Sequence, residues 1–320
     1  VRFFEQAGFE RVILERSLSV EQMREIRRCT SVELEAFVHG AICVGHSGRC
    51  MLSRTMSSRS GNRGECSQPC RLTYDLTDGA GRKLKSGKHL LSVRDLDLSS
   101  HIGQMIDDGI CSFKVEGRLK DISYIKNVVA HYRRRIDEEL AARPTVQRSS
   151  VGESVTDFAP DPAKSFTRGE SSYMFEGKRA GVASFDTPKA VGEYVGRVAR
   201  VDSRTFTLDR SAELAAGDGL CFIADGALTG TNINSVEGRR ITPNRIEGIT
   251  RGAEVYRNFD QRFRLALDRS RTRRVIPATA MVSFDAKGVA LRYTDCEGYT
   301  GEARLDEQLD AASNLERMEQ

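Results

Sequence analysis

Residues 32 to 40 read VELEAFVHG, and the alternation of this stretch decides the expected fold. The apolar set is Val32, Leu34, Ala36 and Val38, and the other set is Glu33, Glu35, Phe37 and His39. A period of two residues is typical of a strand with one face against a core. Residues 110 to 118, ICSFKVEGR, repeat the scheme and put Lys114 and Glu116 on one face.

Helical signals accompany these strands. Ser19 and Gln22 have the spacing of a capping box that opens a helix ending near Arg28. Asp121 is expected to cap a helix whose apolar residues recur at helical spacing up to Leu140. Strands that alternate with helices predict parallel βα units. Three units fall short of a closed (β/α)₈ barrel, which takes about 250 residues, so residues 1–140 are expected to form the carboxyl-terminal half of a (β/α) TIM-like barrel.

The remainder of the chain predicts an α/β plus β organisation. Residues 141–188 are rich in Pro, Ser and Gly and are expected to form a connector. Residues 189–259 consist of short alternating runs separated by turn residues, which predicts a small antiparallel β-barrel that closes near its end. Residues 260–320 are expected to start a further α+β unit, with strands at 278–284 and 288–294 joined as a hairpin and a helix in the polar end.

The composition suits an ordinary globular protein. Of 320 residues, 39% are hydrophobic and 29% are charged, and no apolar run approaches the roughly 18 residues that a membrane-spanning helix needs. No basic segment followed by an apolar stretch opens the chain, so a cytoplasmic location is expected. In a reducing compartment, clustered cysteines are better interpreted as metal ligands or redox groups than as disulfides.

Four of the eight cysteines lie in one loop, residues 43–70, and they are Cys43, Cys50, Cys66 and Cys70. Arg, Ser, Gly and Asn surround them, which is unlike the apolar surroundings of a buried free thiol. Four thiolates suit either tetrahedral zinc or an iron–sulfur cluster. Only Cys66 and Cys70 have the spacing of a zinc knuckle, and a wide set of four also fits a [4Fe-4S] cluster, so spacing leaves both open.

The same loop is basic. Five arginines and a single acid, Glu65, lie between Cys43 and Arg71, a local charge equal to the +4 of the whole chain. Arginines of this kind offset the charge of a metal cluster or contact RNA phosphates. A non-catalytic, zinc-stabilised RNA-binding module is therefore one alternative.

Polar residues near the strand ends are the candidate catalytic groups. Active sites of (β/α) barrels lie at the carboxyl ends of the strands. The candidates are Glu33, Glu35, His39, Lys114 and Glu116. A buried ion-pair network that only fixes packing is the alternative interpretation. A hydrolase is disfavoured, because the sequence has neither G-x-S-x-G nor H-E-x-x-H and the four thiols favour ligation over a single nucleophile.

Residues 33–53, ELEAFVHGAICVGHSGRCMLS, resemble the signature of the collagenase-like peptidase family, peptidase family U32. The matching positions are Glu35, Phe37, Gly40, Cys43, Gly48, Cys50 and Ser53. The resemblance continues through GECSQPCRLTYDL at 64–76 and SFKVEGR at 112–118. It is dense over residues 1–140 and looser over the expected β-barrel.

The resemblance implies a function in oxygen-independent hydroxylation, either of nucleobases in ribosomal or transfer RNA or of the ubiquinone ring. It implies a [4Fe-4S] cluster held by Cys43, Cys50, Cys66 and Cys70, with Arg49 and Ser53 as candidate cofactor-binding residues. It also implies RNA as partner and prephenate as a co-substrate. The domains after the barrel resemble those of the longer, rRNA-hydroxylating members, and a collagenase-like peptidase remains the alternative.

Overall fold

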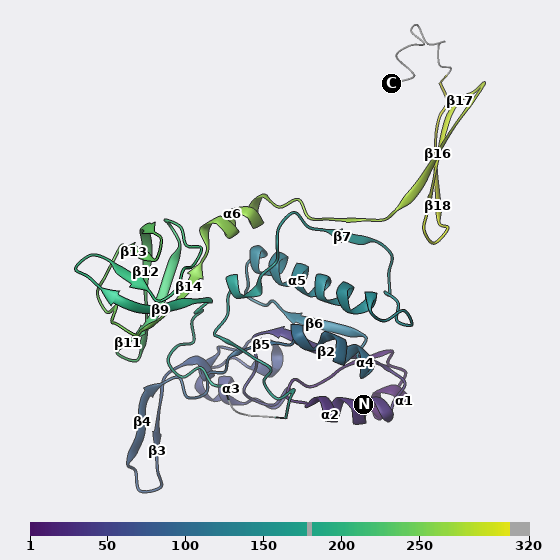
Figure 1. Cartoon of the computed structure of the whole chain (residues 1–320). Helices are drawn as coiled ribbons and strands as arrows, with labels where there is room; N and C mark the ends of the chain where they lie inside the picture. Colours follow the sequence, from purple (N-terminus) through teal and green to yellow (C-terminus); the bar gives the residue numbers. More distant parts are fainter. Residues whose placement is uncertain (178–180, 308–320) are drawn as a thin grey trace. The chain divides into compact units, whose positions relative to one another are not determined.

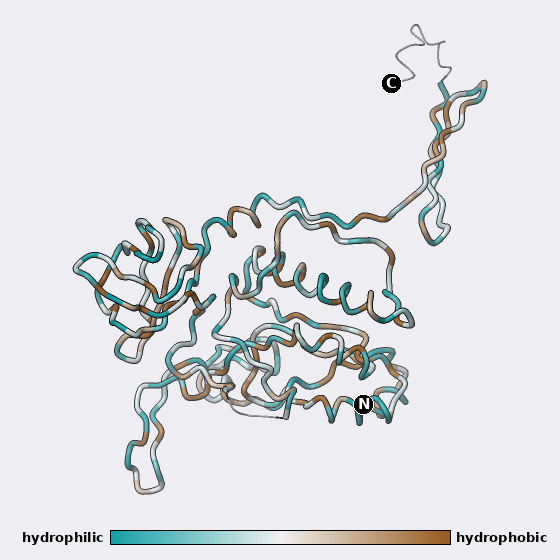
Figure 2. Tube along the Cα trace, in the orientation of Figure 1, coloured by the Kyte–Doolittle hydropathy of each residue, from teal (hydrophilic) through white to brown (hydrophobic). Residues whose placement is uncertain are grey.

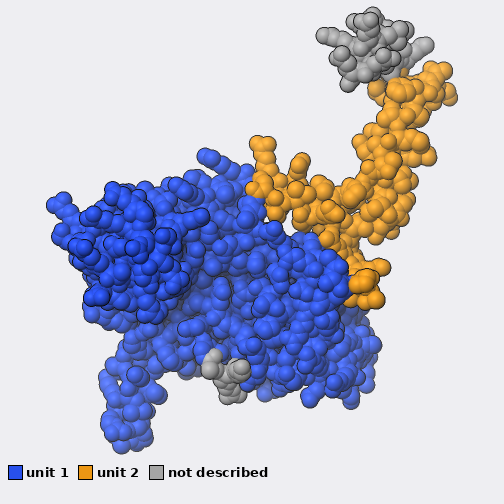
Figure 3. All heavy atoms as spheres, viewed as in Figure 1, with its two compact units in different colours: residues 1–143, 158–270 blue, residues 144–157, 271–320 orange. Residues whose placement is uncertain are grey.

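The computed structural model describes residues 1–177 and 181–307. Their contacts form two compact units, one of residues 1–143 and 158–270 and the other of residues 144–157 and 271–320 (Figure 3). This division does not follow the expected domain boundaries, which stay a prediction. In the described ranges, no helix has the length and apolarity to cross a membrane.

A five-stranded mixed sheet forms the amino-terminal part of the first unit (Figure 1). Strands β1 and β6 both pair in parallel with β2, as the alternating strands and helices predict. Strand β5 runs antiparallel to β2, and β8 pairs in parallel with β5. The strands are β1 (Arg11–Ile13), β2 (Glu33–Gly40), β5 (Asp95–Asp97), β6 (Ser112–Glu116) and β8 (Glu170–Ser171), and a separate hairpin consists of β3 (Tyr74–Thr77) and β4 (Lys83–Lys88).

Helices pack on this sheet, and two of them begin at the predicted caps. The side chain of Ser19 accepts a hydrogen bond from the backbone of Gln22 in a complete capping box, and the Asp121 side chain accepts from Tyr124 N. Both caps satisfy amide groups that have no partner within the helix. The helices are α1 (Arg2–Gln6), α2 (Val20–Arg28), α3 (Leu52–Met56), α4 (Ile102–Asp107), α5 (Ile122–Ala141) and α6 (Gln261–Arg269).

The apolar side chains of β2 lie in the core, as their alternation predicts. Leu34, Ala36 and Val38 are almost completely buried. They belong to one hydrophobic cluster with Met105 of α4 and Val128 of α5. Figure 1 shows α5 running along β2 and β6. The face of β2 that carries these side chains is therefore the covered face of the sheet.

A bulge in β2 corrects one expectation about its polar face. Glu35 pairs with Ser112 and Phe37 with Lys114, but the register then shifts and His39 pairs with Val115. Laterally paired residues project to the same side of a sheet, and an extra residue reverses the alternation beyond it. The expectation that His39 shares a face with Glu33 and Glu35 is wrong for this reason.

The expected connector contributes to the core of the first unit. Tyr173 and Phe175 are buried in the same hydrophobic cluster as β2. Between them and the end of α5 lies β7 (Glu153–Val155), which pairs with β15 (Arg273–Val275) in the second unit. Aromatic side chains spaced irregularly along a loop give no periodic signal, so their burial was not expected.

The predicted β-barrel is confirmed. Six antiparallel strands close in the order β10-β13-β12-β11-β14-β9, and pairing of β14 with β9 and of β9 with β10 completes the circle. Phe206, Phe222 and Ile241 fill its interior. The strands are β9 (Glu193–Val201), β10 (Phe206–Leu208), β11 (Gly219–Ala224), β12 (Ala227–Glu237), β13 (Arg240–Pro243) and β14 (Glu254–Phe259).

The second unit contains a three-stranded antiparallel sheet of β16 (Ala278–Asp285), β17 (Gly288–Asp295) and β18 (Thr300–Leu305). The predicted hairpin is confirmed, because Asp285 pairs with Gly288 at the turn. Figure 2 shows hydrophobic residues along these strands, and Phe284 is 71% exposed. The helix expected in the polar end covers residues 306–320, of which all but the first two lie outside the described residues, and α6 belongs to the first unit.

Candidate functional site

The four-cysteine loop follows the carboxyl end of β2. Cys43 and Cys66 are exposed, Cys50 and Cys70 are partly buried, and all four are free thiols. Burial raises the pKa of Cys70; Arg71 opposes this rise, and the Cys43, Cys66 and Cys50 thiols add to it. The three other cysteines therefore lie within electrostatic reach of Cys70. Among the described residues, no three His, Cys or carboxylate side chains already have the arrangement of a metal site.

Arg71, which directly follows Cys70, ties the two ends of the loop together. Its guanidinium donates to the carbonyl oxygen of Ile42 at 2.9 Å and to that of Val93 at 2.7 Å. A third hydrogen bond, of 2.9 Å, reaches Ser92 Oγ. Ile42 directly precedes Cys43, so Arg71 closes the loop beside its first and last cysteines. Sequence reasoning counted Arg71 only as a charge.

Ser53 holds the interior of the loop. Its side chain is fully buried, and Ser53 Oγ accepts a hydrogen bond of 3.0 Å from Ser67 N. The two hydroxyl oxygens lie 2.9 Å apart, and Ser57 Oγ donates to Ser53 O at 2.8 Å. These bonds join α3 to the segment between Cys66 and Cys70. The hydroxyl of Ser53 is engaged within the loop, while Arg49 is exposed.

The donor set fits a metal group ligated by cysteines. Gln68 has a left-handed backbone, with φ of 56°, and its N–H donates to Cys66 Sγ at 3.3 Å. A Cβ at Gly45 would lie 3.5 Å from Cys50 Sγ, so this glycine leaves the backbone close to a candidate ligand. A hydrogen bond to a ligand sulfur is one of the ways in which a protein tunes a metal group held by cysteines.

Glu35 is the centre of a polar network on the uncovered face of the sheet. Ser112 Oγ donates to Glu35 Oε2 at 2.7 Å, and Lys114 Nζ lies 3.9 Å from Glu35 Oε1. Arg11 lies 3.7 Å from Glu35 and 2.7 Å from Glu33. The structure therefore brings Glu33, Glu35 and Lys114 together as expected.

A second pair extends this network towards the carboxyl ends of the strands. Arg16, just after β1, forms an ion pair of 3.1 Å with Glu116 at the end of β6. The guanidinium of Arg16 lies 4.0 Å from the centre of the Phe37 ring, and Lys114 Nζ lies 5.2 Å from it. Phe37 thus separates two cations on the same face. Glu116 and the cysteine loop lie at the carboxyl end of the parallel strands, where (β/α) folds carry their sites, whereas Glu33 and Glu35 lie in the amino-terminal half of β2.

His39 belongs to a different network. It is 6% exposed and its Nδ1 lies 3.7 Å from Asp97. Tyr132 of α5 donates to Val38 O at 2.7 Å and to Asp97 at 3.1 Å. Burial lowers the pKa of His39 despite the nearby Asp97, so its imidazole is neutral at pH 7. Because of the bulge in β2, the His39 side chain projects to the side of the sheet that α5 covers.

Lys120 is a residue near the strand ends that sequence reasoning missed. It follows Leu119, a non-glycine residue with a φ of 61°, a conformation that costs free energy and is typical of functional sites. Lys120 Nζ lies 3.1 Å from the centre of the Phe166 ring. Burial, followed by the field of Arg168, lowers the pKa of Lys120 to about 8. Its contacts come from distant segments, so no local pattern marks it.

Arg118 joins the SFKVEGR segment to the cysteine loop. Its guanidinium donates to Gly64 O, and its backbone N–H donates to Glu116 Oε1 at 2.9 Å. The two sequence segments that carry the family resemblance are therefore in direct contact.

Comparison with known proteins agrees with this arrangement. The chain is 36% identical over 325 residues to the 23S rRNA 5-hydroxycytidine C2501 synthase of Escherichia coli K12, which covers 99% of this chain and 50% of that protein. It is 38% identical over 216 residues to the tRNA hydroxylation protein P1 of Bacillus subtilis 168, covering 64% and 49%. The chain thus spans about half the length of these relatives.

A third relative has a different name. The collagenase of Porphyromonas gingivalis W83 is 30% identical over 265 residues, which cover 76% of this chain and 62% of that protein. No solved structure matches. Residues 1–183, more than half of the chain, match Peptidase family U32. The resemblance noted from the cysteine signature is therefore confirmed, and the chain belongs to peptidase family U32.

Proposed function

We propose that this chain is part of a cytoplasmic enzyme that hydroxylates a nucleobase in ribosomal or transfer RNA without molecular oxygen. The observation that carries the proposal is that Cys43, Cys50, Cys66 and Cys70 share one loop, which follows the carboxyl end of β2 and is closed by Arg71. The named functions of the relatives in Escherichia coli and Bacillus subtilis support RNA as the substrate class.

In this proposal, the four thiolates hold a [4Fe-4S] cluster. The N–H group of Gln68 donates to one proposed ligand, Cys66, and Gly45 leaves room for the backbone beside another, Cys50. Arg71 fixes the separation of the loop ends, and Ser53 fixes its interior. A bound cluster would supply redox or Lewis-acid chemistry at the mouth of the sheet. Prephenate, which the family resemblance implies, is the proposed co-substrate.

Glu35, Lys114 and Glu116 are the proposed catalytic groups. Lys114 and Arg16 are cations on either side of Phe37, and Glu35 and Glu116 balance them. Such a face can orient an anionic substrate and exchange protons with it. We further propose that β1, β2 and β6 are consecutive strands of a (β/α) barrel, which their parallel pairing supports.

The test is mass spectrometry of nucleosides from ribosomal and transfer RNA. A deletion strain is complemented with the complete gene carrying the wild-type sequence, Cys70→Ser or Cys221→Ser. Cys221 is the matched control because it is a free, buried cysteine of β11, outside the four-cysteine loop.

We expect a hydroxylated nucleoside to disappear in the deletion strain and to return with the wild type and Cys221→Ser, but not with Cys70→Ser. If the RNA nucleosides are unchanged and quinone hydroxylation is defective, the proposed substrate is wrong and hydroxylation of the ubiquinone ring is the function instead. Unchanged RNA and quinone, with loss of a peptide-cleaving activity, would instead favour the peptidase that the Porphyromonas gingivalis relative is named for.

A further inference from the structure

A cavity of about 570 Å³ lies within the first unit, where the sheet and the segment after α5 meet the β-barrel. Its wall does not include the cysteine loop. One side carries Arg94, Arg168 and Phe185, and the barrel side carries Tyr194 of β9, Ile223 of β11 and Tyr256 of β14. The cavity is large enough for a nucleotide, and ligand sites commonly form where two parts of a fold meet.

Aromatic rings line the barrel side of this cavity. The rings of Tyr194 and Tyr256 pack edge to face with centres 5.5 Å apart. The guanidinium of Arg210 lies 5.0 Å from the centre of the Tyr194 ring and fixes that ring further. Phe185 is 48% exposed and Tyr194 is 37% exposed. Arg210 and Tyr256 thus cover part of Tyr194, and the rest of its surface and about half of that of Phe185 stay open to solvent.

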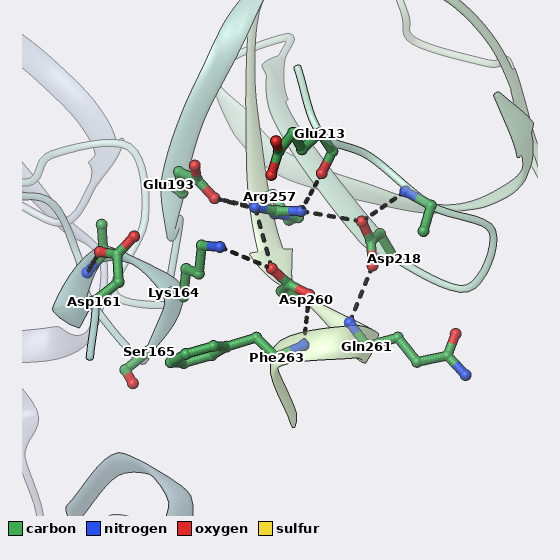
Figure 4. Close-up of polar contacts among 12 residues, drawn as sticks. Asp161, Lys164, Ser165, Glu193, Glu213, Asp218, Arg257, Asp260, Gln261 and Phe263 are labelled. Atoms are coloured by element: carbon green, nitrogen blue, oxygen red, sulfur yellow. Dashed lines mark hydrogen bonds and ion pairs between the residues drawn. The ribbon is translucent and has the colours of Figure 1, made fainter. Parts of the chain in front are cut away.

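Three acids of the wall, Asp186, Glu254 and Glu193, each have an ion-pair partner. Asp186 pairs with Lys88 at 2.7 Å, and Glu254 accepts from Tyr256 at 2.9 Å and pairs with Arg197. Figure 4 shows Glu193 bound to Arg257, which also contacts Asp218 and Asp260.

Glu170 is the remaining acid of the wall. Withdrawal of its carboxyl from water and the nearby Asp97, Asp161 and Asp95 raise the pKa of Glu170 to about 7, although the residue keeps exposed surface.

Arg94 is the unmatched charge. Its side chain forms no hydrogen bond or ion pair with any residue in the described ranges, while Arg168 is held by Asp95 at 2.9 Å and by Pro188 O at 2.7 Å. Gly169 lies against Arg94, since a Cβ there would be 3.5 Å from Arg94 Nε. Arg94 is also close enough to Tyr256 to lower its pKa, against a larger rise caused by burial. An unpaired guanidinium therefore lies beside exposed aromatic rings.

We propose that this cavity binds an unstacked nucleotide of single-stranded RNA, with the base on Tyr194 and Phe185 and the adjoining phosphate on Arg94. Single-stranded RNA is recognised by stacking on aromatic side chains and by cations along its backbone. The inference rests on the proposed function, and it adds a site that anchors the RNA away from the cysteine loop. An unpaired arginine beside rings disfavours an apolar peptide.

The test is fluorescence anisotropy of a labelled oligouridine with the complete protein. Stacking is worth about 1–3 kcal/mol per base, so Tyr194→Leu should weaken binding about five-fold or more, and Tyr194→Phe should bind like the wild type. Arg94→Ala should weaken binding and reduce its dependence on salt. Arg204→Ala is the matched control, because Arg204 is exposed on a barrel turn outside the cavity wall.

Equal binding by all variants, or no binding of oligouridine by the wild type, overturns the inference. Competition by uridine monophosphate at the same concentration as the oligomer would assign the cavity to a free nucleotide and also overturns it. The nucleoside analysis decides the proposed function separately. Weakened binding in Tyr194→Leu with an unchanged nucleoside profile in the deletion strain would retain the RNA site and reject the hydroxylation.

Discussion

The β-barrel and the mixed sheet of the first unit differ in whether their strands have unpaired edges. All six barrel strands pair on both sides, so the barrel has no free edge. In the described part of the sheet, β1 pairs only with β2 and forms an edge. Ile13 on β1 is 47% exposed, whereas Ile241 in the barrel is fully buried. The barrel stabilises itself by its own packing, and the sheet does so only in part.

The two regions also differ in how their buried charged side chains are paired. In the barrel, the buried Arg257 contacts the carboxylates of Glu193, Asp218 and Asp260 (Figure 4). Near the sheet, half-buried Lys120 has an aromatic ring as its closest partner and a lowered pKa. Lys120 therefore lacks the carboxylate partners that Arg257 has, and a half-buried charge of this kind with a perturbed pKa marks a candidate functional site.

The largest expected difference between the two regions concerns metal. In the complete protein purified without oxygen, replacing Cys43, Cys50, Cys66 or Cys70 by Ser should each remove most of the iron and acid-labile sulfide, because each removes a thiolate ligand. Iron and sulfide analysis measures this.

Two cysteines outside the loop are controls for that result. Cys111 precedes β6, at the opposite end of the strand from the loop, and Cys221 is a buried residue of β11. Serine at either position should leave iron near the wild-type level. Zinc in place of iron under strict anaerobiosis would contradict the cluster.

Two matched isoleucines test the packing difference. Ile241→Ala removes a fully buried side chain and should cost about 2–5 kcal/mol of unfolding free energy, since it leaves a cavity in the barrel. Ile13→Ala, at the exposed edge, should cost less than about 1 kcal/mol. Urea unfolding followed by circular dichroism measures both. Equal costs would show that β1 is covered in solution.

The pH dependence of stability tests the unpaired charge. The pKa of Lys120 is about 8 in the folded protein and about 10.4 in an unfolded chain. The charged form therefore destabilises the fold below pH 8, and this penalty disappears as the pH rises to about 10.5.

Lys120→Met should accordingly be more stable than the wild type by about 1 kcal/mol at pH 7, a value reduced by solvent screening, and equal to it near pH 10.5. Lys85→Met, on the exposed β3–β4 hairpin, is the control and should show no such convergence. If the difference in unfolding free energy between Lys120→Met and the wild type stays constant across this pH range, the lowered pKa assigned to Lys120 is wrong.

Exposed ion pairs should not distinguish the two regions. Arg134 and Glu138 on α5 lie 3.7 Å apart, and Arg197 and Glu254 pair across barrel strands. Arg134→Gln and Arg197→Gln should each change the unfolding free energy by less than about 0.5 kcal/mol, because water screens both pairs. Thermal unfolding measures this, and a larger loss in the barrel variant would reveal a role for Glu254 in holding the cavity wall.

Local patterns explain which features could be predicted. The alternation of β2, the Ser19 cap and the turns of the barrel each depend on residues a few positions apart, and all are confirmed. The misplacement of His39 depends on its pairing with Val115, which lies far along the chain. The same is true of Arg71, whose partners Ile42 and Val93 are more than twenty residues away. Long-range contacts such as these leave no periodic signal in the sequence.

Arg71 has a consequence for how quickly a metal group can assemble. Bringing together the ends of a flexible loop of roughly thirty residues costs about 3 kcal/mol in chain entropy. Because Arg71 binds Ile42 O, the loop ends are already held together in the folded protein, and this entropy is lost on folding and not on metal binding. The four thiols then search a small volume instead of that of a free chain. Because burial raises the pKa of Cys70, ligation by this thiol should become more favourable as the pH rises.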